Sequence, residues 1–129
     1  MGYPNDHNRG TCGAGVSVKL SEKQAIFTVN VAKLILWAEA QGYKLTFGEA
    51  YRPQEMADIY YQRGIGSKNS LHTKRLAVDF NLFCNGRYMT DSESYARLGT
   101  AWEALDPQNR WGGRFKGNLV DGNHFERKE

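Results

Sequence analysis

The sequence predicts a single α+β domain in which helices pack against a small antiparallel sheet. Three observations support this class: a long early segment with helical spacing, two later segments that alternate like strands, and a hairpin turn signal after the second of them. The chain has 129 residues, of which 40% are hydrophobic, so it can bury one core but has little room for a second domain.

The first helix is expected to begin at the capping box Ser21-Glu22-Lys23-Gln24 and to end before Gly42, because glycine is favoured just past a helix end. Several apolar residues behind the box recur at helical spacing, and we expect them to face the core. They are Ala25, Val29, Ala32, Leu36 and Ala40.

Two shorter helices are expected further along the chain. Pro53 favours a helix start, which predicts a helix over residues 54–63. Thr90-Asp91-Ser92-Glu93 is a second capping box, and the helix behind it is expected to reach Leu105 and to end at Asp106-Pro107.

Two segments alternate apolar and polar residues as strands do, one from Tyr43 to Ala50 and the other from Arg75 to Phe83. In the second, Leu76, Val78, Phe80 and Leu82 share one face, and Ala77, Asp79 and Asn81 share the other. Asn85-Gly86 predicts a hairpin turn after it. The glycines and aromatics after residue 110 predict short strands joined by tight loops.

Residues 1–16 show no periodicity and are expected to form a flexible leader, which assigns residues 17–129 to the folded domain. The N-terminus lacks the order of a secretory signal, and no apolar segment approaches the roughly 20 residues that span a bilayer. We therefore expect no membrane insertion. We also expect a chain that stays in the cytoplasm of the producing cell until other proteins release it. His7 is expected to be incidental, and Cys12 and Cys84 to be free thiols.

The formal charge of +3 suits an anionic polymer such as a cell wall. The 17 lysines and arginines are spread along the chain, whereas nucleic-acid binding favours basic clusters with interleaved aromatics. We expect no nucleic-acid partner, and a monomer.

His72, Asp79 and His124 are candidates for a metal site. A loop histidine before a strand and an aspartate on that strand's polar face can converge on one ion, and zinc accepts nitrogen and oxygen ligands. Spacing alone leaves an alternative open, in which these are a surface-loop histidine and a strand-end aspartate.

Three ordered motifs narrow the choice. Ser70-Leu71-His72-Thr73-Lys74-Arg75-Leu76-Ala77-Val78-Asp79 resembles the S-x-H-x-x-G-x-A-x-D signature of the M15 zinc metallopeptidases. Trp111-Gly112-Gly113 followed by Asp121-Gly122-Asn123-His124 is similar to the second motif of that family, and Tyr51-Arg52-Pro53 to its Y-R segment. The family includes D-Ala-D-Ala carboxypeptidases and dipeptidases and the phage L-alanyl-D-glutamate endolysins.

The resemblance implies the DD-peptidase fold shared with Hedgehog domains, and one zinc ion held by His72, Asp79 and His124. It implies Asp121 as the catalytic base, which takes a proton from the attacking water. Arg52 would hold negative charge on the substrate or the oxyanion, with a structural ion pair as the alternative. Ser70 would touch the substrate or cap the ligand loop, and Trp111 is a candidate for lining the cleft. Glu126 is either a partner of a ligand or a solvated tail charge.

The resemblance further implies a peptidase that hydrolyses an amide of the bacterial peptidoglycan stem peptide. Two departures from the signature bear on this. Arg75 replaces the usual glycine, which predicts a backbone conformation there that does not require glycine. Asp121 stands where many carboxypeptidases have glutamate, which favours the endolysin branch and its L-Ala-D-Glu bond. Two alternatives stay open: a D-Ala-D-Ala carboxypeptidase or dipeptidase, and an inactive zinc-bearing module that binds the wall.

Overall fold

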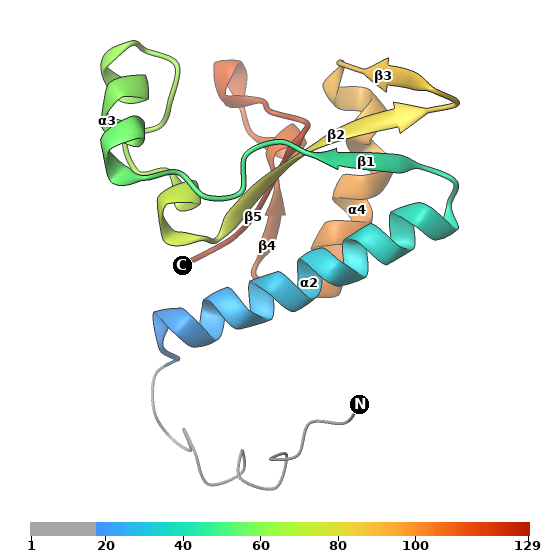
Figure 1. Cartoon of the computed structure of the whole chain (residues 1–129), viewed down its shortest axis with the longest axis horizontal. Coiled ribbons are helices and arrows are strands. Elements are labelled where there is room, and N and C mark those ends of the chain that lie inside the picture. The colour runs from blue at the N-terminus through green and yellow to red at the C-terminus, as the bar shows by residue number, and fades with distance from the viewer. Residues whose placement is uncertain (1–17) are drawn as a thin grey trace, which may run out of the picture.

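The computed structural model describes residues 18–129 (Figure 1). The expected leader, His7 and Cys12 lie outside this range. The described chain forms three helices, α2 (Leu20–Ala40), α3 (Gln54–Gln62) and α4 (Ala96–Leu105), and five strands. The strands are β1 (Lys44–Phe47), β2 (Ala77–Cys84), β3 (Arg87–Met89), β4 (Asn109–Trp111) and β5 (His124–Arg127). Short 3-10 turns η1 (Leu71–Lys74), η2 (Ser92–Tyr95), η3 (Gly112–Arg114) and η4 (Gly117–Leu119) complete it.

The five strands form one sheet in the order β1-β2-β5-β4, with β3 paired to β2, and all these pairs are antiparallel. The predicted α+β class is therefore confirmed. Asn85 and Gly86 form the predicted hairpin turn, with φ of 52° and 78°. Both values are positive, as a two-residue hairpin turn of this type requires.

One face of the sheet carries the core. The predicted apolar face of β2 is buried there, against α2 and α4 (Figure 1). Trp102 of α4 lies at its centre, edge-on to Phe27 of α2 and Phe125 of β5 at ring distances of 5.6 and 6.2 Å. With this face covered, the opposite face of β2, which carries Asp79, is left for a site.

The predicted core face of the first helix is wrong. All five residues assigned to it are exposed, and the buried residues are Phe27, Asn30, Leu34 and Ala38. Apolar residues occur all round α2, so two stripes have helical spacing. The stripe with Phe27 and Leu34 offers more apolar area to bury than the alanine-rich one, and it wins.

The predicted helix starts also shift. The first residue before α2 is Lys19 rather than Ser21, and the Glu22 carboxylate accepts the Lys19 N–H at 3.3 Å. The second capping residue is Asp91 rather than Thr90, because Asp91 accepts the Ser94 N–H at 3.1 Å. Gly42 does follow α2 as predicted, with φ of 85°. Within residues 18–129, no helix has the length and apolar character needed to cross a bilayer.

Candidate active site

The strand register brings two of the three candidate ligands together. Asp79 of β2 and His124 of β5 are directly opposite each other in the antiparallel pair, so their side chains share a face. His72 comes from η1, the turn that leads into β2. Ser70 caps this turn by accepting the His72 N–H at 3.2 Å, which fixes the backbone that carries the imidazole.

These three side chains form a compact cluster. One ligand atom from each of His72, Asp79 and His124 lies within 4.8 Å of the others. Asp79 Oδ1 is 3.3 Å from His72 Nε2 and 3.2 Å from His124 Nδ1. Both histidines are buried, at 2% and 9% exposure, so they are not the surface-loop residues of the alternative interpretation.

The second nitrogen of each imidazole has its own partner. His72 Nδ1 faces the Ala50 carbonyl at 3.4 Å, and His124 Nε2 faces the Glu126 carboxylate at 2.7 Å. Glu126 in turn pairs with Arg110 at 2.5 Å. Metal-ligating histidines in proteins generally donate their other ring N–H to a carbonyl or carboxylate in this way. His72 Nε2 and His124 Nδ1 are therefore left to face an ion.

Charge is strongly coupled across the cluster. Burial alone would raise the pKa of Asp79, but its hydrogen bonds to His124 and His72 lower that pKa to about 2. Burial alone would lower the pKa of His124, but Asp79 and Glu126 raise it to about 9. A dication in place of the His124 Nδ1 proton would meet Asp79, while Glu126 would keep the proton on Nε2.

Asp121 stands at the edge of this cluster, on the segment that leads into β5. Its carbonyl accepts the His124 N–H at 3.1 Å, and its own N–H donates to Gly112 at 3.0 Å. A side chain at Gly112 would come within 2.2 Å of the Asp121 carbonyl, so the close approach requires glycine here. Burial raises the pKa of the Asp121 carboxyl, and the negative charge of Asp79 acts in the same direction. The carboxyl is accordingly better suited to hold a proton than an ordinary surface aspartate.

Arg52 and Ser70 lie together on the His72 side. Arg52 donates through Nε to Glu49 at 2.7 Å and pairs with it again through Nη2. Its Nη1 donates to Ser70 Oγ at 3.2 Å. The two alternatives considered for these residues, an ion pair for Arg52 and a loop cap for Ser70, are both present. Glu49 is a partner that the sequence analysis did not identify.

Arg75 shows that this position does not require glycine, although its conformation is one that glycine favours. Its backbone is left-handed, with φ of 56° and ψ of 36°, which is the conformation that favours the glycine of the signature. The Arg75 guanidinium stacks 3.9 Å above the Tyr51 ring, which gives the arginine a contact that glycine lacks.

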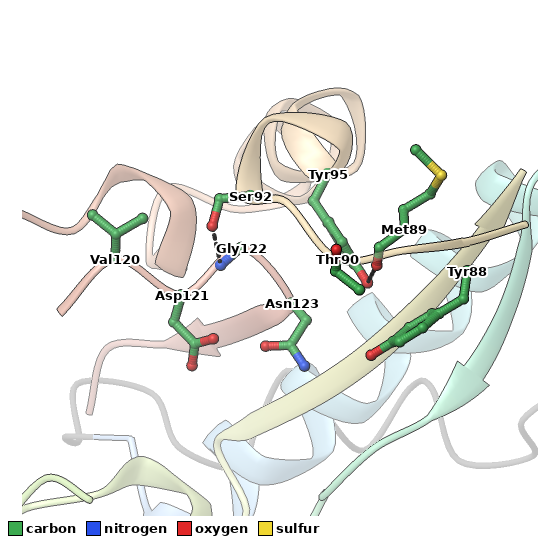
Figure 2. Close-up of a pocket in the computed structure, with 9 residues that line it drawn as sticks. All are labelled: Tyr88, Met89, Thr90, Ser92, Tyr95, Val120, Asp121, Gly122 and Asn123. Carbon is green, nitrogen blue, oxygen red and sulfur yellow. Dashed lines mark hydrogen bonds between the residues drawn. The ribbon is translucent and has the colours of Figure 1, made fainter. Parts of the chain in front are cut away.

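Trp111 does not line a cleft. It is 5% exposed, belongs to the core, and donates its indole N–H to the Gly122 carbonyl at 2.7 Å. Trp111 is therefore placed to hold the segment that carries Asp121 rather than to contact substrate. Ser92 supports the same segment, because its hydroxyl accepts the Gly122 N–H at 3.0 Å (Figure 2). The position of Glu126 beside His124 could be predicted from the sequence, because residues two apart on a strand lie on the same face.

This fold and this cluster agree with what the resemblance to the M15 peptidases implies. The profile of the family described as D-alanyl-D-alanine carboxypeptidase matches residues 63–127, half of the chain and all three clustered residues. The chain belongs to this family, the M15 peptidases.

A solved structure has the same fold. It is the Serratia marcescens L-Ala D-Glu endopeptidase ChiX, with 24% identity and a TM-score of 0.56 over 65% of this chain. The match spans 66% of the length of that protein. A search of curated proteins found no significant match.

Proposed function

We propose that this protein is a zinc-dependent peptidase that hydrolyses an amide bond of the peptidoglycan stem peptide, as phage endolysins do. The observation that carries the proposal is the buried cluster of His72, Asp79 and His124, whose ligand atoms lie within 4.8 Å of one another.

The donor set fits zinc. Catalytic zinc sites in proteins use three ligands drawn from imidazole, carboxylate and thiolate, and leave one position open. Two imidazoles and one carboxylate meet that requirement, and the acceptors on Ala50 and Glu126 favour the tautomers that leave His72 Nε2 and His124 Nδ1 for the ion. When bound, zinc supplies Lewis-acid chemistry that polarises the scissile carbonyl and acidifies water.

The protein's own side chains do the remaining work. Asp121 lies outside the ligand set, but the hydrogen bond from the His124 N–H to its carbonyl holds it beside that set. Its carboxylate can therefore take a proton from water and return it to the leaving amine. Arg52 presents a planar fork of guanidinium donors, which can stabilise negative charge on the substrate. Glu49 orients the guanidinium for this task.

The L-Ala-D-Glu bond is our first choice of substrate. It is supported by aspartate rather than glutamate at position 121, and by the endopeptidase activity in the name of the structural relative. A D-Ala-D-Ala carboxypeptidase is the second candidate, supported by the description of the family. An inactive wall-binding module would need neither Asp121 nor Arg52, and both are present.

Digestion of purified peptidoglycan, followed by mass spectrometry of the fragments, tests the proposal. We expect new fragments that begin at D-Glu, which a chelator abolishes and added zinc restores. Release of D-Ala instead would select the second candidate. The Asp121→Ala variant should retain the metal and lose turnover. If the zinc-loaded wild type cuts no bond, the proposed activity is wrong.

A further inference from the structure

A pocket of about 280 Å³ opens beside Asp121, between β3, η2 and residues 120–123 (Figure 2). Among the described residues that line it, Asp121 carries the only charged side chain. Ligand sites in proteins run from roughly 300 to 1,000 Å³, so this pocket suits a single sugar or amino-acid residue. Neither Arg52 nor His72 lines it.

Several polar groups in the pocket are free to bind a ligand. The hydroxyls of Tyr88 and Thr90 and the side-chain amide of Asn123 line it, and none of them hydrogen-bonds to another residue within 18–129. The walls behind them are fixed. The Tyr95 hydroxyl accepts the Leu82 N–H at 3.0 Å. It donates to the Met89 carbonyl at 2.9 Å (Figure 2). The free groups are thus held on rigid supports, as a binding site requires.

An aromatic ring stands at the mouth of the pocket. Tyr88 is 51% exposed, and its ring lies 5.3 Å from that of Phe83 at 34°, which limits its motion. A tyrosine ring combines an apolar face with a polar tip. The C–H face of a pyranose packs against such a ring, while its hydroxyl and acetamido groups bond to neighbouring hydroxyls and amides. The pocket therefore has the chemistry of a carbohydrate site.

Charge determines which end of the substrate fits here. From D-Glu onward the stem peptide carries carboxylates, which the Asp121 carboxylate disfavours and Arg52 favours. On the other side of the bond, L-Ala is joined through a lactyl amide to N-acetylmuramic acid, and that part is neutral. We propose, resting on the function proposed above, that the pocket beside Asp121 binds the N-acetylmuramic acid residue of the glycan. The enzyme then recognises stem peptides that are still attached to sugar.

Cleavage of two synthetic substrates tests the inference. Both contain the same L-Ala-D-Glu stem peptide, and the N-terminus bears either an N-acetylmuramoyl group or a plain acetyl group. We expect kcat/KM to be about thirtyfold higher with the sugar, as two net hydrogen bonds would give. Tyr88→Ala should reduce this ratio toward one. Tyr61→Ala is the matched control, because Tyr61 is also 51% exposed but lies on α3, and it should keep the ratio. Equal cleavage of both substrates by the wild type would overturn the inference and leave the proposed function standing.

Binding separates the two proposals if neither substrate is cut. N-acetylmuramoyl-L-alaninamide, titrated into the protein, should shift the amide NMR signals of Thr90 and Asn123, and N-acetyl-L-alaninamide should not. Those shifts without cleavage would support the sugar site and contradict the peptidase function. The absence of shifts at these residues would reject the sugar site whether or not the peptide is cut.

Discussion

Replacing Glu126 by glutamine tests how the protein orients His124. Glu126 is 7% exposed, accepts from His124 Nε2 at 2.7 Å, and pairs with Arg110 at 2.5 Å. Glutamine keeps the shape and one acceptor oxygen but removes the charge. Hydrogen bonds to charged groups are about twice as strong as neutral ones, and a neutral bond contributes about 1 kcal/mol, so the loss should also be about 1 kcal/mol. Zinc affinity should therefore fall about five- to tenfold.

A competition titration with a chromogenic chelator measures this affinity directly. Glu103→Gln is the matched control, because Glu103 also pairs with an arginine, Arg114, at 2.6 Å, away from the two imidazoles. It should leave zinc affinity unchanged. If Glu126→Gln binds zinc as tightly as the wild type, Glu126 does not act through the His124 imidazole and the reasoning fails.

Three further predictions concern the backbone, the charges and the Asp121 segment. Arg75→Gly and Arg75→Ala both lose the stack on Tyr51, but only glycine adopts the left-handed backbone without strain. Chemical denaturation should therefore show the glycine variant to be more stable than the alanine variant by about 1 kcal/mol. Equal stabilities of the two variants would contradict this. Without metal, His124 has a pKa raised from 6.5 to about 9, so its contribution to stability is complete below pH 6.5 and disappears as the pH rises through 9. Asp79 has a pKa lowered from 3.8 to about 2, so its contribution is complete above pH 3.8 and disappears as the pH falls toward 2. The midpoint temperature of thermal unfolding, measured in chelator, should therefore be highest between pH 3.8 and 6.5, and a flat pH profile would disagree. Ser92→Ala leaves the Gly122 N–H without its partner, which should cost about 1 kcal/mol of stability and reduce turnover; unchanged turnover would show that this bond does not position the Asp121 segment.

Local patterns predicted the strands well, because a period of two and a turn signal depend on neighbours in sequence. The polar face of β2 placed Asp79 correctly, and Asn85-Gly86 ended the strand where expected. The convergence of Asp79 with His124 depends instead on how β2 pairs with β5, and no local pattern contains that register. Only the resemblance to a family joined these residues before the structure did.

The wrong core face of α2 and the left-handed backbone at Arg75 have the same origin, because both depend on contacts with residues that are distant in the sequence. The buried side of α2 is chosen by what packs against it, and Phe27 meets Trp102, which is 75 positions later in the chain. Arg75 adopts a glycine-like conformation because the turn around His72 and the stack on Tyr51 hold it there. The replacement of the signature glycine by Arg75 therefore does not indicate a different backbone conformation at this position.

Anomalous diffraction at the zinc edge, from crystals grown with zinc, tests the central claim most directly. We expect one peak at bonding distance from His72 Nε2, an Asp79 carboxylate oxygen and His124 Nδ1, with Glu126 still bonded to His124 Nε2. A peak elsewhere, or one bonded to His124 Nε2, would contradict it.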